Sequence, residues 1–395
     1  MNIKILKDSQ GFDGVIVNHR KVLEIKPQKS LYPGIDQVKY YLFDLETNEK
    51  EEVLPKIKKF NIAKIEASIF DSDFILFSSI VPLEKTKVQI QIIKYYFLTE
   101  EYETIISFTE DITLFPKEKR IRVFPLNDSY VIIQTETLKS NINNDYKGFF
   151  NFEITMYNTK ENQEIKIIDQ NLLYNGIDSL VPISETHSAI KTGYSLFEDR
   201  LFEKLTDEEA CVESISVINT QQLISDILLY SENLLQETIN QAHYTTSFSP
   251  IMVREDYLVY SIINFQTKEE DINFYNFITK ENINCRNQNI EEPENLAKTY
   301  VIDNMPYVKL ITERGTEFYN IIRGKVDIIF ENDVEVNEYI NNIFIVSRII
   351  KKTKHKTKAV LSIYKYPGMT LLHEEKALFS GCVDVDKENI HVFVK

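Results

Sequence analysis

The chain has 395 residues, a net charge of −15 at pH 7 and a hydrophobic fraction of 43%. Such a composition can bury a large core, which excludes an intrinsically disordered chain. The negative charge argues against a general nucleic-acid or anionic-membrane binder, because either surface would repel the chain at long range. The length fits two or three ordinary domains, or one large β repeat domain.

No segment has the apolar run of a secretory leader or the roughly 18 apolar residues of a membrane span. The three cysteines, Cys211, Cys285 and Cys382, are odd in number and far apart, which argues against a disulfide framework. We therefore expect a cytoplasmic protein that has no membrane partner.

A β-hairpin pattern recurs along the whole chain. In each copy an apolar strand, a short polar turn and a second apolar strand follow one another, as in IRVFPL-NDS-YVIIQT at 121–135. The copies lie at 65–79, 121–135, 179–192, 249–262, 299–311, 334–348 and 382–395.

A second unit follows most of these hairpins and consists of an alternating strand, a tight turn and another strand. The clear copies lie at 38–54, 152–168, 271–285, 317–330 and 360–373, with a degenerate one at 214–219. Together the two units make four strands and recur near the roughly 40–50 residue period of propeller blades. The chain thus resembles β-propellers as a class. It matches no named repeat family, because ten glycines are too few for the signatures of WD40 or kelch blades.

The resemblance implies an all-β fold, a single β-propeller domain over residues 1–395. Each sheet would cover the faces of its neighbours around a ring. We predict seven blades, with the hairpin 382–395 pairing with the unit 38–54 so that both termini share one blade. The segment 14–25 also looks like a hairpin, so eight blades is the alternative.

The segment 194–242 interrupts the repeat. Phe197, Leu201 and Leu205 recur at helical spacing, and Thr206 to Glu209 fits a capping box. Further on, either a helix over 220–241 or a strand pair over 214–229 fits the pattern. We predict a partly helical insertion in the fourth blade, and a domain boundary here is the alternative.

The loops of the repeat differ between the two faces of the expected ring. We call upper the face that carries the loops between the second and third strands, and lower the opposite face. Lower turns are short and acidic, whereas upper loops are long and in places basic, and long loops on a rigid scaffold usually carry binding functions. The candidate binding residues are Lys351, Lys352, Lys354, His355, Lys356 and Lys358, together with Tyr32, Tyr146, His243 and Tyr244.

Sequence motifs for catalysis are absent. The chain has no GxSxG, GxxxxGK[ST], GxGxxG, HExxH or CxxC pattern. We therefore predict no catalytic residue, no metal site and no cofactor. The leading hypothesis is a non-enzymatic binding or scaffold protein that engages a protein or peptide through its upper face. The alternative is an enzyme acting on a small polar or carbohydrate substrate at the mouth of the central channel, and a third possibility is a structural module of a larger assembly.

Overall fold

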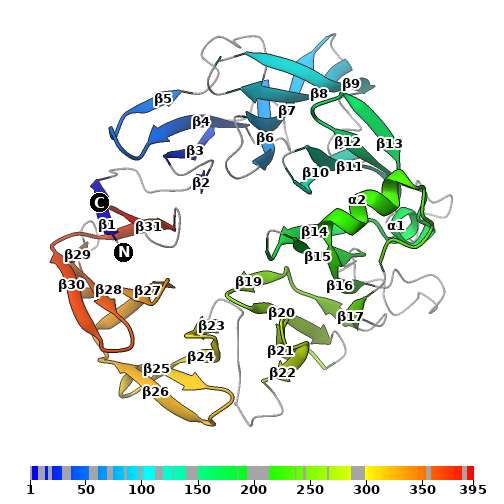
Figure 1. The fold of residues 1–395 in the computed structure, drawn as a ribbon. Helices are drawn as coiled ribbons and strands as arrows, with labels where there is room; N and C mark the ends of the chain where they lie inside the picture. The colour runs from blue at the N-terminus through cyan, green and yellow to red at the C-terminus, as the bar shows by residue number, and fades with distance from the viewer. Residues whose placement is uncertain are drawn as a thin grey trace.

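The computed structural model describes residues 2–7, 14–16, 20–28, 37–52, 61–68, 74–83, 87–96, 99, 101–111, 119–127, 129–138, 150–184, 186–193, 213–235, 237–242, 246–264, 267–285, 299–352, 357–384 and 389–395. In this part of the chain the strands form eight sheets that stand in a ring (Figure 1). Apart from the sheet that joins the termini, each sheet consists of consecutive strands that pair antiparallel from the inside of the ring outward, except that β18 and β19 both pair with β20. The all-β propeller prediction is confirmed.

The blades follow the order of the chain. The first four are β2 (Gly14–Ile16), β3 (Lys21–Gln28), β4 (Gln37–Asp44) and β5 (Lys50–Glu52); β6 (Asn61–Ser68), β7 (Phe74–Pro82), β8 (Lys87–Tyr96) and β9 (Tyr102–Asp111); β10 (Lys119–Pro125), β11 (Tyr130–Leu138), β12 (Phe150–Asn158) and β13 (Gln163–Lys166); and β14 (Ile177–Pro182), β15 (His187–Thr192), β16 (Ser214–Asn219) and β17 (Thr238–Gln241).

The next three blades are β18 (Thr246–Phe248) and β19 (Met252–Arg254) with β20 (Tyr257–Asn264), β21 (Glu270–Asn276) and β22 (Glu281–Asn284); β23 (Thr299–Ile302), β24 (Met305–Thr312), β25 (Gly315–Asn320) and β26 (Lys325–Phe330); and β27 (Val334–Ile340), β28 (Ile343–Lys352), β29 (Thr357–Lys365) and β30 (Thr370–Glu375). The eighth blade combines β31 (Phe379–Asp384) and β32 (Asn389–Val394) with the N-terminal β1 (Asn2–Lys7).

The ring closes through this eighth blade. β1 pairs in parallel with β32, from Asn2 opposite Asn389 to Lys7 opposite Val394. The unit 38–54 does not complete this blade, because its strand β4 pairs with β3 and its strand β5 with β4, in the blade that begins with β2. The structure therefore has eight blades, the alternative count, in place of the preferred seven. The pairing assumed for seven blades overlooked β1, a single strand whose partner lies at the far end of the sequence.

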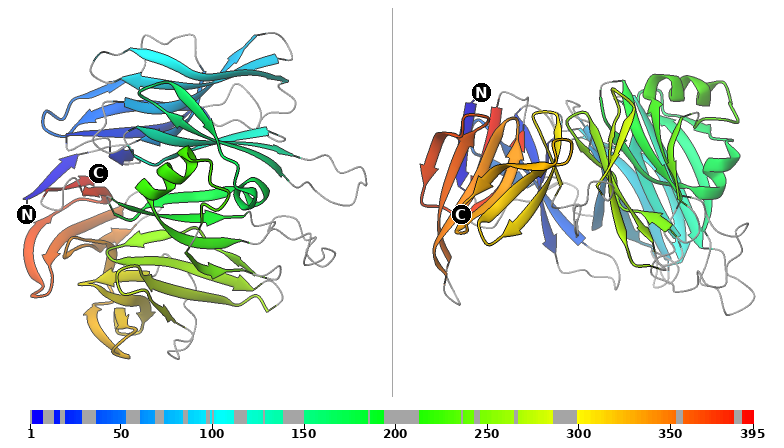
Figure 2. Two further views of the ribbon diagram at one scale, coloured as in Figure 1. Left: turned by 45° about the vertical axis from the view of Figure 1, so that its right-hand side comes forward. Right: turned by 90° about the horizontal axis from the view of Figure 1, so that it is seen from below.

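The segment 194–242 is partly helical and partly blade. Residues 194–212, with the helical stripe at Phe197, lie outside the described residues. β16 and β17 are the outer strands of the fourth blade, and α2 (Thr220–Leu228) lies between them at the lower face (Figures 1 and 2). The helix starts where the sequence predicted, because the Asn219 side chain accepts a hydrogen bond from the Gln222 amide at 2.9 Å and caps it. It ends at Leu228 rather than near residue 241.

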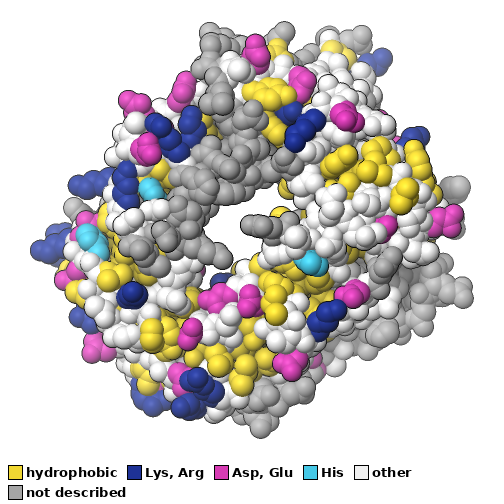
Figure 3. Space-filling model, in the orientation of Figure 1, with side chains coloured by type: hydrophobic (Ala, Val, Ile, Leu, Met, Phe, Trp, Pro, Cys, Tyr) yellow, Lys and Arg dark blue, Asp and Glu magenta, His cyan; other side chains and the backbone are white. Residues whose placement is uncertain are grey.

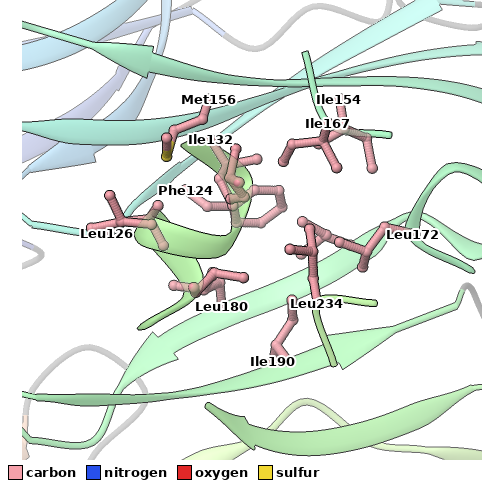
Figure 4. Packing of buried hydrophobic residues seen from close by; sticks show 14 of the residues in the cluster. Phe124, Leu126, Ile132, Ile154, Met156, Ile167, Leu172, Leu180, Ile190 and Leu234 are labelled. Atoms are coloured by element: carbon pink, nitrogen blue, oxygen red, sulfur yellow. The ribbon is translucent and has the colours of Figure 1, made fainter. Parts of the chain in front are cut away.

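A shorter helix, α1 (Gln170–Asn175), connects the third blade to the fourth and is capped by Asp169. Among the described residues no helix, α1 and α2 included, is long and apolar enough to cross a membrane. Both helices extend the hydrophobic core between these two blades. The cluster shown in Figure 4 joins Phe124, Leu126, Ile132, Ile154, Met156 and Ile167 of the third blade to Leu172, Leu180, Ile190 and Leu234.

Large side chains fill the spaces between neighbouring blades. Phe344 of β28 is fully buried, and its ring lies 5.5 Å from that of Phe318 and 5.2 Å from that of Phe330, both in the preceding blade. Tyr339 of β27 contacts the same ring at 4.7 Å. Such aromatic pairs contribute about 0.5–1.5 kcal/mol each beyond the area that they bury. Adjacent blades therefore supply each other's core.

The closure of the ring can be tested at Leu6, whose side chain is 3% exposed and packs with Val22, Leu45 and Phe393 of the first and last blades. We expect Leu6→Ala to lower the free energy of unfolding by about 2–5 kcal/mol, because it leaves a cavity at the junction. The neighbouring Lys7 is exposed, so Lys7→Ala is a matched control with an expected effect within about 0.5 kcal/mol. Equal urea-unfolding curves for the two variants would contradict this closure.

Candidate functional site

The basic run at the upper face forms the end of a projecting β-ribbon. β27 pairs with β28 only as far as Arg348, and β30 pairs with β29 only from Leu361 onward. Beyond these points Ile349–Lys352 pair with residues 357–359 of β29 alone. The two strands therefore extend past the four-stranded blade, and no other described strand pairs with their outer edges there.

The side chains of this ribbon are exposed. The first five residues of β28 are buried and the last five are exposed, including Ile349 at 40% and Ile350 at 59%. Lys351 lies opposite Lys358 in the register, and both are exposed, as is Lys352. The structure thus brings three of the predicted lysines together beside two exposed isoleucines. We call residues 349–352 and 357–358 the basic ribbon.

The other predicted binding residues cannot be placed. Lys354, His355, Lys356, Tyr32, Tyr146, His243 and Tyr244 all lie outside the described residues. The described strands that flank them end at the upper face, as expected from the order of strands in each blade.

A chain of charged side chains crosses three blades near the same face. Arg122 of β10 donates to Glu136 of β11 at 2.9 Å and to the backbone oxygen of Asp178, in the next blade, at 2.8 Å. It also contacts the Asp178 carboxylate at 3.2 Å. Glu136 is fully buried, so its charge is balanced inside the protein rather than by water.

Lys191 of β15 continues the chain into the fifth blade. Its buried ammonium lies 3.0 Å from Asp178 and 3.6 Å from Glu213, and it donates to the backbone oxygen of Phe248 at 2.8 Å. Glu213 accepts a hydrogen bond from the Ser247 hydroxyl at 2.6 Å and one from the Phe248 amide at 2.8 Å. This row of charged side chains therefore contains three carboxylates (Glu136, Asp178 and Glu213) and two cations (Arg122 and Lys191), each of which has a specific partner.

Burial raises the pKa of the Glu213 carboxyl above its ordinary value, and the opposing effects of Lys191 and the two hydrogen bonds do not fully offset it. Burial likewise raises the pKa of the Cys285 thiol to about 12. Cys285 is thus a protonated core residue, not a reactive thiol. Among the described residues no group of three or more His, Cys, Asp or Glu side chains is placed to hold a metal ion.

A pocket of about 290 Å³ lies at the lower face, between α2 and the turn that joins β21 to β22. It is lined by apolar side chains such as Leu223 and Leu234 and by polar ones such as Asp226 and Lys280. Figure 3 shows a separate opening at the centre of the ring. Sequence reasoning missed both this pocket and the charged chain.

The charged chain left one signal in the sequence. Lys191 and Glu136 are charged residues in strands that also contain apolar residues, in HSAIKT and VIIQTE. Charged side chains in buried strands require partners. Those partners come from other blades, so no local spacing could identify them.

Comparisons with known proteins show the fold. No family model and no curated protein matches this chain. Among solved structures, it is similar to dipeptidyl peptidase 4 of Porphyromonas gingivalis, with a TM-score of 0.52 and 9% identity over 96% of this chain. The match covers 56% of that chain, so this protein spans little more than half of its length.

Two further structures have lower TM-scores. The β-propeller domain of the Trilobed protease from Pyrococcus furiosus has a TM-score of 0.43 and 10% identity, covering 94% of this chain and 96% of that one. An oligogalacturonate lyase from Vibrio parahaemolyticus has a TM-score of 0.42 and 10% identity, covering 93% of this chain and 77% of that one. At these identities the likeness concerns the fold alone.

The charged chain can be tested by removing its central cation. Lys191→Met leaves Glu213 and Asp178 without their shared ammonium, and we expect the free energy of unfolding to fall by about 3–5 kcal/mol. Lys280→Met is the matched control, because the exposed Lys280–Glu237 pair contributes only about 0–1 kcal/mol. Urea unfolding of both variants measures the difference, and equal losses would show that Lys191 has no special role.

The raised pKa of Glu213 gives a pH test. The folded chain retains a proton that the unfolded chain releases above about pH 4.3, so this group's contribution to stability is present at low pH and is lost as pH rises through the raised pKa. Glu213→Gln does not titrate. We therefore expect the stability of Glu213→Gln relative to wild type to increase between about pH 4 and 8, measured by urea unfolding. A difference that stays constant over this range would refute the assignment.

Proposed function

We propose that this protein is a non-enzymatic binding or scaffold propeller that engages an acidic protein or peptide through the basic ribbon of its upper face. The observation that carries the proposal is the exposure of Ile349 to Lys352 on a two-stranded extension of a blade. A two-stranded ribbon is only marginally stable in water by itself. An ordered partner strand would complete it.

The ribbon offers two kinds of contact to such a partner. Its open edges can pair with an extended peptide through backbone hydrogen bonds, the mode known as β-augmentation. Its lysines favour acidic side chains, and Ile349 and Ile350 offer apolar contacts between them. The lysines also discourage two copies of the ribbon from pairing with each other, because like charges on edge strands repel.

The location of the charge supports the same proposal. The whole chain carries −15, yet residues 351–358 contain five lysines and no acidic residue. A basic site on an acidic protein attracts an acidic partner locally while the rest of the surface repels it, which favours one binding orientation. We place this interaction in the cytoplasm, where the free thiols of Cys285 and Cys382 would stay reduced.

The alternative, an enzyme acting on a small polar or carbohydrate substrate at the channel mouth, has weaker support. Glu136, Asp178 and Glu213, buried or half-buried carboxylates near the upper face, are all in ion pairs with Arg122 or Lys191. Carboxylates with such partners are held in structural roles. The peptidases and the lyase among the similar structures share the fold only.

The proposal can be tested with two labelled extended peptides of equal length, one alternating Glu and Val and the other alternating Lys and Val. We expect only the acidic peptide to bind the wild-type protein in fluorescence anisotropy. Replacing Lys351, Lys352, Lys354, Lys356 and Lys358 with Ser should weaken its binding by at least about tenfold, because the charge complementarity is lost.

A matched control carries the same change in charge at another place. It replaces five lysines outside the ribbon with Ser: Lys166, Lys268, Lys365, Lys376 and Lys395. We expect this variant to bind the acidic peptide nearly as well as wild type does. Equal losses in the two variants would reduce the effect to net charge and would overturn the proposed ribbon site, as would binding of both peptides alike.

A further inference from the structure

The pocket at the lower face is built by two neighbouring blades. α2 with Leu234 and Glu237 of the fourth blade forms one side, and β21 with its turn to β22 in the fifth blade forms the other. Its volume of about 290 Å³ is at the lower end of the range found for small-molecule sites. The pocket is on the face opposite the basic ribbon, so its occupant is independent of the proposed peptide partner.

One part of the pocket is apolar. Ile218, Leu223 and Leu234 line it and are 6%, 3% and 4% exposed, so their positions are set by the core cluster to which they belong. Tyr275 and Phe277 from the fifth blade add half-buried aromatic side chains. A flat or branched apolar group of a ligand can therefore contact rigid side chains from both blades.

The other part of the pocket is polar and carries an excess of negative charge. Glu237 and Lys280 form an ion pair at 3.3 Å, and each is about two-thirds exposed. The Asp226 carboxylate accepts a hydrogen bond from the neutral amide of Gln222 at 2.7 Å. Lys280 thus balances Glu237, whereas the partner of Asp226 brings no charge, and the excess of negative charge comes from Asp226.

We propose that this pocket binds a small amphipathic amine. Its ammonium group would pair with Asp226, and its apolar body would lie against Leu223, Leu234 and the ring of Tyr275. A cation beside aromatic rings gains a further attraction to their faces. The chain's net charge of −15 raises the local concentration of small cations and lowers that of anions.

A series of probes that share a phenylethyl group separates charge from shape. Phenethylamine, 3-phenylpropionate and phenylalanine carry a similar aromatic body with a positive, a negative and a zwitterionic polar end. We expect ligand-observed NMR to show binding of phenethylamine, and clearly weaker or no binding of the other two. Stronger binding of the carboxylate or of the zwitterion would overturn the assignment of an amine, because Lys280 would then be the main recognition group.

Two variants test the role of Asp226. Asp226→Asn keeps the shape of the side chain, and we expect it to weaken phenethylamine binding by at least about tenfold. Glu232→Gln changes an exposed carboxylate in the same segment, outside the pocket lining, and should leave the affinity unchanged. Thermal unfolding of both variants verifies that they fold. Equal affinity in wild type and Asp226→Asn would refute the site, whatever the outcome of the peptide experiment on the ribbon.

Discussion

Every blade of this protein relies on its neighbours to cover its two faces, so the fold depends on closing the ring. Closure rests on one parallel pairing, in which β1 completes the last blade beside β32. Leu6 places this junction in a core shared with Val22 and Phe393. A four-stranded sheet cannot bury both of its sides alone, whereas eight sheets around an axis leave only short edges in contact with water.

The contacts between blades are of two chemical kinds. Around Phe344 the junction is aromatic and apolar, and its strength comes from area and ring geometry. Between the third, fourth and fifth blades, charged residues around Lys191 add directional contacts to the apolar ones. Ionic contacts in a buried place add little net stability compared with apolar packing, but they become costly when one partner is removed. In this part of the ring the loss of one charged partner therefore has a large electrostatic consequence.

The two faces of the ring expose different side chains, because the segments that connect the strands differ between the two faces. At the upper face the strands β28 and β29 continue past their neighbours and expose lysines and isoleucines on open edges. At the lower face most described turns are short, and among the described residues the longer connection is the one in which α2 leaves the fourth blade and encloses a pocket against the fifth. The proposed acidic peptide and the proposed small amine would bind on opposite faces, so neither would block the other.

The strand pattern, the polar turns and their recurrence are local properties, so the sequence by itself determined the all-β class, the hairpins and the propeller arrangement. It also located the basic run, because charge and exposure follow from residue type and turn position. Only the tertiary structure decided the number of blades, since the partner of β1 lies at the opposite end of the chain. The same is true of the charged chain and of the pocket, because Lys191 and Phe248, or Asp226 and Tyr275, are brought together by the stacking of separate blades and not by any spacing along the sequence.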